Sequence, residues 1–118
     1  MSFTDKIATN ITVNNQNCYY LHFTVKRMST KQNFYLKLIN TSETGAITEQ
    51  LIDTYEVQKG SSSSVLHFET IISPNATYNG ILWELQRDSS DLSGNKRVMN
   101  VTVNSFTRLK NILSTLNI

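Results

Sequence analysis

Apolar and polar residues alternate through most of this chain, and this period of two strongly limits the folds open to it. Leu21, Phe23 and Val25 occupy every second position of one stretch. Ile81, Trp83 and Leu85 repeat the pattern late in the chain. Successive side chains of a β-strand point to opposite faces of its sheet. The pattern therefore predicts sheets that have one buried face and one wet face.

The alternating stretches are short, and polar segments separate them. Seven of them are expected to form strands, at residues 7–13, 18–27, 33–39, 46–57, 65–72, 81–87 and 97–103. Glu49 and Asp53 interrupt the alternation of the fourth strand, so we expect a bulge or a bend there. The polar residues 14–17 indicate a hairpin between the first two strands. We predict an all-β fold, a jelly-roll-like antiparallel β-sandwich of about seven to eight strands.

The period of the apolar residues changes near the C-terminus. Phe106, Leu109, Ile112, Leu113 and Leu116 fall at helical spacing. This spacing predicts a short C-terminal helix of about three turns. Its apolar stripe would pack against the sandwich or against a neighbouring subunit. The candidate interface residues are therefore Phe106, Leu109, Leu113 and Leu116.

Size and charge restrict the classes of partner. The 118 residues are enough for one domain, residues 1–118, with a single core. The net charge is +2 and the Lys and Arg residues are scattered, so we expect no nucleic-acid partner. No apolar run is long enough to span a membrane, and residues 1–6 lack the basic start and apolar stretch of a signal peptide. We therefore expect synthesis in a cytoplasm and no membrane partner.

The sequence contains no familiar catalytic motif. It has no glycine-rich phosphate loop, HExxH, CxxC or Ser-His-Asp signature. His67 and Glu69 share one strand face and are the best candidates for a small hydrolase, but no residue set favours one reaction. Asp88, Asp91 and Asn95 are oxygen donors in one loop, although their spacing fits no EF-hand. We expect no enzymatic activity, no cofactor and no metal.

Aromatic side chains are expected on the wet faces of two strands. Tyr20 and Tyr35 alternate with the inferred core residues, and His22 shares the face of Tyr20. Rings that lie flat on a sheet stack on sugars, and a neighbouring histidine supplies hydrogen bonds. Tyr20, His22 and Tyr35 are therefore the candidate glycan-binding residues. The alternative is that these tyrosines pack within the domain or against a partner subunit.

Segments in the last third of the chain carry a resemblance to known proteins. Residues 72–87 read Ile-Ser-Pro-Asn-Ala-Thr-Tyr-Asn-Gly-Ile-Leu-Trp-Glu-Leu-Gln-Arg, and residues 96–101 read Lys-Arg-Val-Met-Asn-Val. With residues 106–113, they resemble small β-sandwich modules of tailed-phage virions: baseplate, tail-fibre or capsid-decorating proteins, some similar to carbohydrate-binding modules. The resemblance covers about half of the chain and includes no signature motif, so no functional residue is carried over from it. It implies a non-enzymatic, multi-copy part of a particle, for which a host glycan is a candidate ligand.

These observations lead to a ranked pair of hypotheses. The first is a structural or adhesive component of a bacteriophage particle, located in the virion after synthesis in the host cytoplasm. Its partners would be other virion proteins or further copies of itself, and a host cell-surface glycan is a candidate ligand. The alternative is a stand-alone carbohydrate-binding module.

Overall fold

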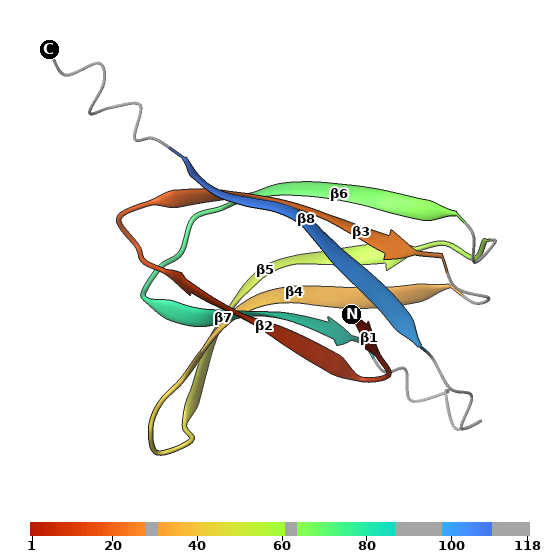
Figure 1. Cartoon of the computed structure of the whole chain (residues 1–118). Helices are drawn as coiled ribbons and strands as arrows, with labels where there is room; N and C mark the ends of the chain where they lie inside the picture. Colours follow the sequence, from red (N-terminus) through yellow and green to blue (C-terminus); the bar gives the residue numbers. More distant parts are fainter. Residues whose placement is uncertain (28–30, 61–63, 87–97, 110–118) are drawn as a thin grey trace, which may run out of the picture.

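The protein is a β-sandwich of two antiparallel sheets (Figure 1). The computed structural model describes residues 1–27, 31–60, 64–86 and 98–109. The strands are β1 (Ser2–Phe3), β2 (Lys6–Val13), β3 (Cys18–Lys26), β4 (Gln32–Thr41), β5 (Ile47–Val57), β6 (Val65–Ile72), β7 (Tyr78–Leu85) and β8 (Met99–Leu109). The predicted all-β sandwich is confirmed. The described ranges contain no helix, and hence none that could cross a membrane.

The strand order is that of a jelly roll. One sheet, which we call the β3 sheet, has the order β1-β8-β3-β6, and the other, the β4 sheet, has the order β2-β7-β4-β5. The pairs are nested: β1 pairs with β8, β2 with β7, β3 with β6 and β4 with β5. Eight strands folded in this nested way form the double-sheet jelly roll. It leaves β5 and β6 as the edge strands on one side of the sandwich.

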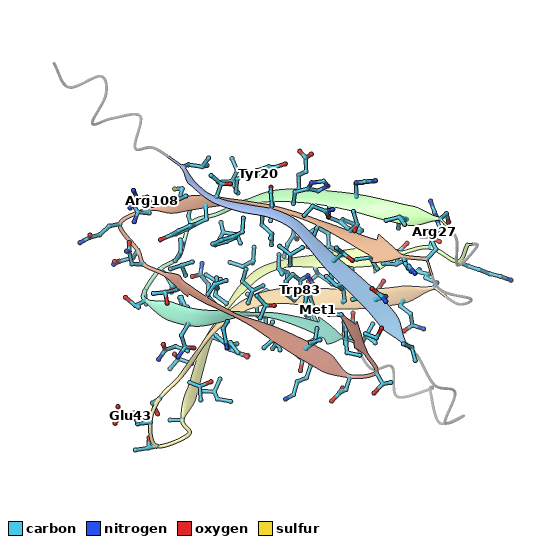
Figure 2. The ribbon with its side chains drawn as sticks, viewed as in Figure 1. Met1, Tyr20, Arg27, Glu43, Trp83 and Arg108 are labelled. Carbon is cyan, nitrogen blue, oxygen red and sulfur yellow. The ribbon has the colours of Figure 1, made fainter. Side chains whose placement is uncertain are left out.

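The core lies between the two sheets and is rich in aromatic rings. The Phe23 ring centroid lies 6.1 Å from that of Phe34, 5.7 Å from Tyr55, 5.2 Å from Phe68 and 5.8 Å from Trp83. Phe23 and Trp83 are fully buried, and Figure 2 shows Trp83 in the space between the sheets. Both sheets supply alternate residues to this core, as the period of two predicts.

The polar segment 14–17 reverses the chain but does not form the predicted hairpin. The Asn14 side-chain oxygen accepts hydrogen bonds from the Gln16 backbone N–H, at 2.9 Å, and from the Asn17 amide, at 3.1 Å. The flanking strands β2 and β3 nevertheless belong to different sheets. The local hydrogen bonds of Asn14 set the turn, whereas pairing with β7, β6 and β8 decides which sheet each strand joins.

The prediction of a C-terminal helix is wrong for the residues expected to form its first turn. Phe106 and Leu109 lie in strand β8 instead. Phe106 packs against the core, and its ring stacks on Tyr19 with centroids 5.4 Å apart. Leu113 and Leu116 lie outside the described residues.

A β-bulge explains why β8 resembles a helix in sequence. Val103 and Ser105 face consecutive residues of β3, so Asn104 is an extra, bulged residue. Because of the bulge, the next side chain after Val103 that faces the core is that of Phe106, three residues on, and not that of Ser105. This three-residue step has the spacing of a helix, although both side chains project from a strand.

The irregularity expected in the fourth strand, a bulge or a bend, is a bulge. In the β4–β5 pair, Leu36 faces Asp53 and Lys37 faces Leu51, which leaves Ile52 as the extra residue of β5. Beyond this bulge, Leu51 and Ile47 are exposed on the outer face of the sheet. The two-residue strand β1 was not predicted, because so short a segment shows no alternation.

Candidate functional site

The outer face of the β3 sheet gathers four polar side chains, which we call the polar cluster: Tyr20 and His22 from β3, and His67 and Glu69 from β6. The strands are antiparallel, with His22 directly opposite Glu69 and Thr24 opposite His67. All four side chains alternate with core residues and therefore point away from the core. Figure 2 shows Tyr20 on this outer side of the sandwich.

The two histidines of the polar cluster are in direct contact. His22 Nε2 lies 3.2 Å from His67 Nδ1, within hydrogen-bond distance. The ring centroids are 5.4 Å apart and the ring planes differ by 26°. His22 is half-buried and His67 is exposed, so solvent reaches the pair.

Glu69 gives the polar cluster its negative charge. Desolvation raises the pKa of the Tyr20 phenol, and the charge of Glu69 together with a hydrogen bond to its carboxylate raises it further. In the described parts of β3, β6 and β8, the cationic side chain on this outer face is that of Lys26, four residues after His22. The arrangement therefore offers one carboxylate, one phenol and two imidazoles on an open sheet surface.

Tyr35 is on the opposite side of the molecule from the polar cluster. It lies on the outer face of the β4 sheet, where the Lys37 ammonium is 5.3 Å from its ring centroid. Lys37 also pairs with Glu84 at 2.9 Å and Glu49 at 3.3 Å. The structure thus brings Tyr20 and His22 together but separates Tyr35 from them, because β3 and β4 join different sheets. The three residues cannot form one glycan platform.

The outer face of the β4 sheet also carries an open groove of about 560 Å³. Its lining residues are Ala8, Asn10, Ile11, Thr12, Ile39, Thr41, Asn79 and Gly80. The Asn79 amide is committed to the backbone of Thr41, which donates to Asn79 Oδ1 and accepts from Asn79 Nδ2, both at 3.1 Å. None of the lining side chains is titratable, so this groove offers shape and hydrogen bonds but no acid or base.

The edge strands on one side of the sandwich, β5 and β6, differ in how well they are protected against pairing with another strand. β5 contains a bulge and three carboxylates, Glu49, Asp53 and Glu56. β6 pairs with β3 along all eight of its residues without a register shift, and Glu69 is its one formal charge. Bulges and charges are the usual devices that keep an edge strand from pairing. β6 therefore is the less protected edge.

The two predicted interface residues that the structure describes, Phe106 and Leu109, expose only part of their side chains to a partner. Phe106 is packed on Tyr19 and the core, so it is largely used within the domain. Leu109 ends β8 opposite Cys18 and is half-buried. Among the described residues, the most exposed large apolar side chains are elsewhere, at Ile71 of β6 (63%) and Ile47 of β5 (60%).

The sequence identified His67 and Glu69 as a candidate pair but did not place them beside His22. Their meeting depends on the register of β3 against β6, which alternation does not reveal. Within the described ranges, no group of three His, Cys, Asp or Glu side chains is arranged to hold a metal ion. The oxygen donors Asp88, Asp91 and Asn95 lie outside those ranges.

Comparisons of this chain with protein-family models, with curated proteins and with solved structures found no match.

Proposed function

We propose that this chain is a non-enzymatic structural component of a bacteriophage particle, and that it works through contacts between subunits. The observation that carries the proposal is the open β6 edge. Within the described residues, no strand pairs with the side of β6 that faces away from β3. An unpaired strand presents a row of backbone donors and acceptors to any second chain.

The side chains of β6 suit a contact with another copy. Val65 and Ile71 stand on its outer face, with 42% and 63% of their surfaces exposed. Two β6 strands related by a twofold axis would pair antiparallel, and the two β3 sheets would join into one. Each copy would then cover part of the exposed aliphatic surface of the other.

Two further observations support a role in a particle. The double-sheet jelly roll is used by viral capsid and lectin domains, although a fold alone does not assign a function. The resemblance of the last third of the chain to phage-virion modules points in the same direction. In such a particle, weak contacts at each site would be multiplied by copy number.

A pair of matched lysine substitutions tests this proposal. Ile71→Lys places a charge beside the β6 edge, and Ile47→Lys places one beside the β5 edge at a similarly exposed site. We expect the native chain to form dimers or larger assemblies in light scattering over a concentration series. Ile71→Lys should abolish them because a charge at an edge opposes strand pairing. Ile47→Lys should leave them intact.

A native chain that stays monomeric throughout the concentration series would contradict the proposal. So would an assembly that Ile71→Lys leaves unchanged. Far-UV circular dichroism of both variants checks that each remains folded.

A carbohydrate-binding module is the second candidate function, and the polar cluster favours it. Tyr20, His22, His67 and Glu69 together present a ring, hydrogen-bond donors and a carboxylate on one accessible face.

Tyr35 serves as the matched control in a test of this candidate, since it is an outward-facing tyrosine on the other sheet. On a glycan array, Tyr20→Ala should abolish binding and Tyr35→Ala should preserve it. Absence of binding by the native chain, or equal loss in both variants, would remove this candidate.

A further inference from the structure

We propose that His22 and His67 bind a divalent late first-row transition-metal ion, such as Zn²⁺, through the two ring nitrogens that now face each other. This inference is independent of the proposed assembly. It concerns a pair of side chains that neither the jelly-roll core nor the β6 edge requires.

The distance between the two nitrogens already suits a shared metal ion. His22 Nε2 and His67 Nδ1 are 3.2 Å apart. Two nitrogens bound to tetrahedral zinc at about 2.0–2.1 Å lie about 3.3 Å from each other. The backbone register places the two side chains at diagonal positions on neighbouring strands, because β3 and β6 pair without a shift on both sides of the histidines. Metal binding would require both rings to turn so that their lone pairs point at one ion and not at each other.

The protons of the imidazoles can be arranged to allow this. Without metal, one ring donates its N–H to the lone pair of the other. With metal, both facing nitrogens offer lone pairs, and the protons reside on Nδ1 of His22 and Nε2 of His67. Those outer nitrogens then donate to water or to nearby acceptors, as the second nitrogen of a metal-bound histidine usually does.

The charges around the pair favour a cation. Glu69 faces His22 across the strands, and it raises the pKa of Tyr20 through its negative charge and a hydrogen bond. On β8, the nearest neighbours are neutral: Ser105 lies opposite His22 and Thr102 lies opposite Thr24. Lys26 is on the same face of β3, beyond Thr24. A divalent ion would therefore have the Glu69 carboxylate directly opposite one of its ligands, whereas Lys26 lies at the diagonal position on the other side of Thr24.

The ligand set also defines the class of metal. Imidazole nitrogens suit zinc, copper and nickel, whereas calcium and magnesium prefer oxygen ligands. The described residues place no third ligand in the same group, so water would complete the coordination. The site should therefore be selective for the metal class but weaker than a structural zinc site with four protein ligands.

The test is a calorimetric titration of the full chain, without a histidine tag, with Zn²⁺. We expect saturable binding of one ion per chain, and none with Ca²⁺ or Mg²⁺. His22→Gln and His67→Gln should each weaken zinc binding at least about tenfold, since even losing the outer partner of a metal ligand costs about 10- to 100-fold. Thr107→Ala, an exposed substitution elsewhere on the same face, should leave binding unchanged.

Nuclear magnetic resonance of the native chain provides a second readout that requires no variant to fold. The ring resonances of both histidines should shift together with zinc and saturate at the same ratio. Absence of saturable zinc binding would overturn the inference. It would also be overturned by undiminished binding in the double variant His22→Gln, His67→Gln, or by ring resonances that do not respond to zinc.

Discussion

Phe23 is the side chain on which the core rings converge. It contacts aromatic rings of both sheets and is fully buried. Alternation in the sequence was sufficient to place it in the core, and likewise to place Tyr20 and His22 on the outer face. Alternation identifies the face of a strand but not the neighbouring strand. The contact of His22 with His67 therefore could not be predicted.

Replacing Phe23 should show how much stability depends on this aromatic centre. Phe23→Ala should lower the free energy of unfolding by about 3–5 kcal/mol, because it removes buried apolar surface and leaves a cavity. Tyr35→Ala, a substitution on an outer face, should cost less than about 1 kcal/mol. Urea denaturation of both variants measures the difference. Equal losses would mean that the ring of Phe23 does not hold the sheets together.

Lys37 makes the free energy of unfolding depend on pH in the alkaline range. The hydrogen bond to Glu84 raises the pKa of Lys37, burial opposes that shift, and Glu49 adds to it. Because the folded pKa exceeds the unfolded pKa, the stabilisation is complete below about pH 10.4, the ordinary lysine pKa. It is lost as the pH rises through the folded pKa.

The free energy of unfolding of the native chain should therefore fall as the pH rises above about 10.4. Lys37→Met should show a smaller fall, since that variant has no ammonium to deprotonate at this site. Urea denaturation at a series of pH values makes the comparison. Parallel curves for the two proteins would show that Lys37 contributes nothing to the pH dependence.

Among the elements, the β4–β5 hairpin requires one left-handed residue. Gly45 has a φ of +85°, and its N–H donates to the Ser42 carbonyl at 3.0 Å. A Cβ at this position would meet no atom within 4 Å, so the cost of a side chain comes from the backbone alone. Non-glycine residues adopt this conformation at a penalty of roughly 1–2 kcal/mol.

Gly45→Ala should accordingly reduce the free energy of unfolding by about 1 kcal/mol. Gly45→Asn should reduce it less, because asparagine tolerates the left-handed region better than alanine does. Thermal denaturation of the two variants ranks them. An alanine variant as stable as the native chain would indicate that the hairpin adopts another turn.

The strands also show which features of an element are readable from sequence. The bulge in β5 was predictable because Glu49 and Asp53 interrupt the apolar positions. The bulge in β8 was not, because the step from Val103 to Phe106 is indistinguishable from helical spacing. In β8 the register against β3 overrides that local pattern.

For the whole molecule, the alternation predicts the sandwich but not the order of its strands. The nested pairs join residues far apart in the chain, such as Ser2 with Asn100 and Lys6 with Glu84. Such pairings are set by the packing of entire sheets and leave no local pattern. The identity of β6 as an edge strand, on which the proposed assembly depends, follows only from the complete strand order.

Hydrogen exchange of the backbone amides, measured with and without self-association, is the most direct test of that assembly. At concentrations where the chain associates, peptides covering Val65–Ile72 should exchange more slowly than in the dilute monomer. Peptides covering Ile47–Val57 should exchange at an unchanged rate. Slower exchange in β5 alone, or no change in β6 on association, would contradict a particle built through the β6 edge.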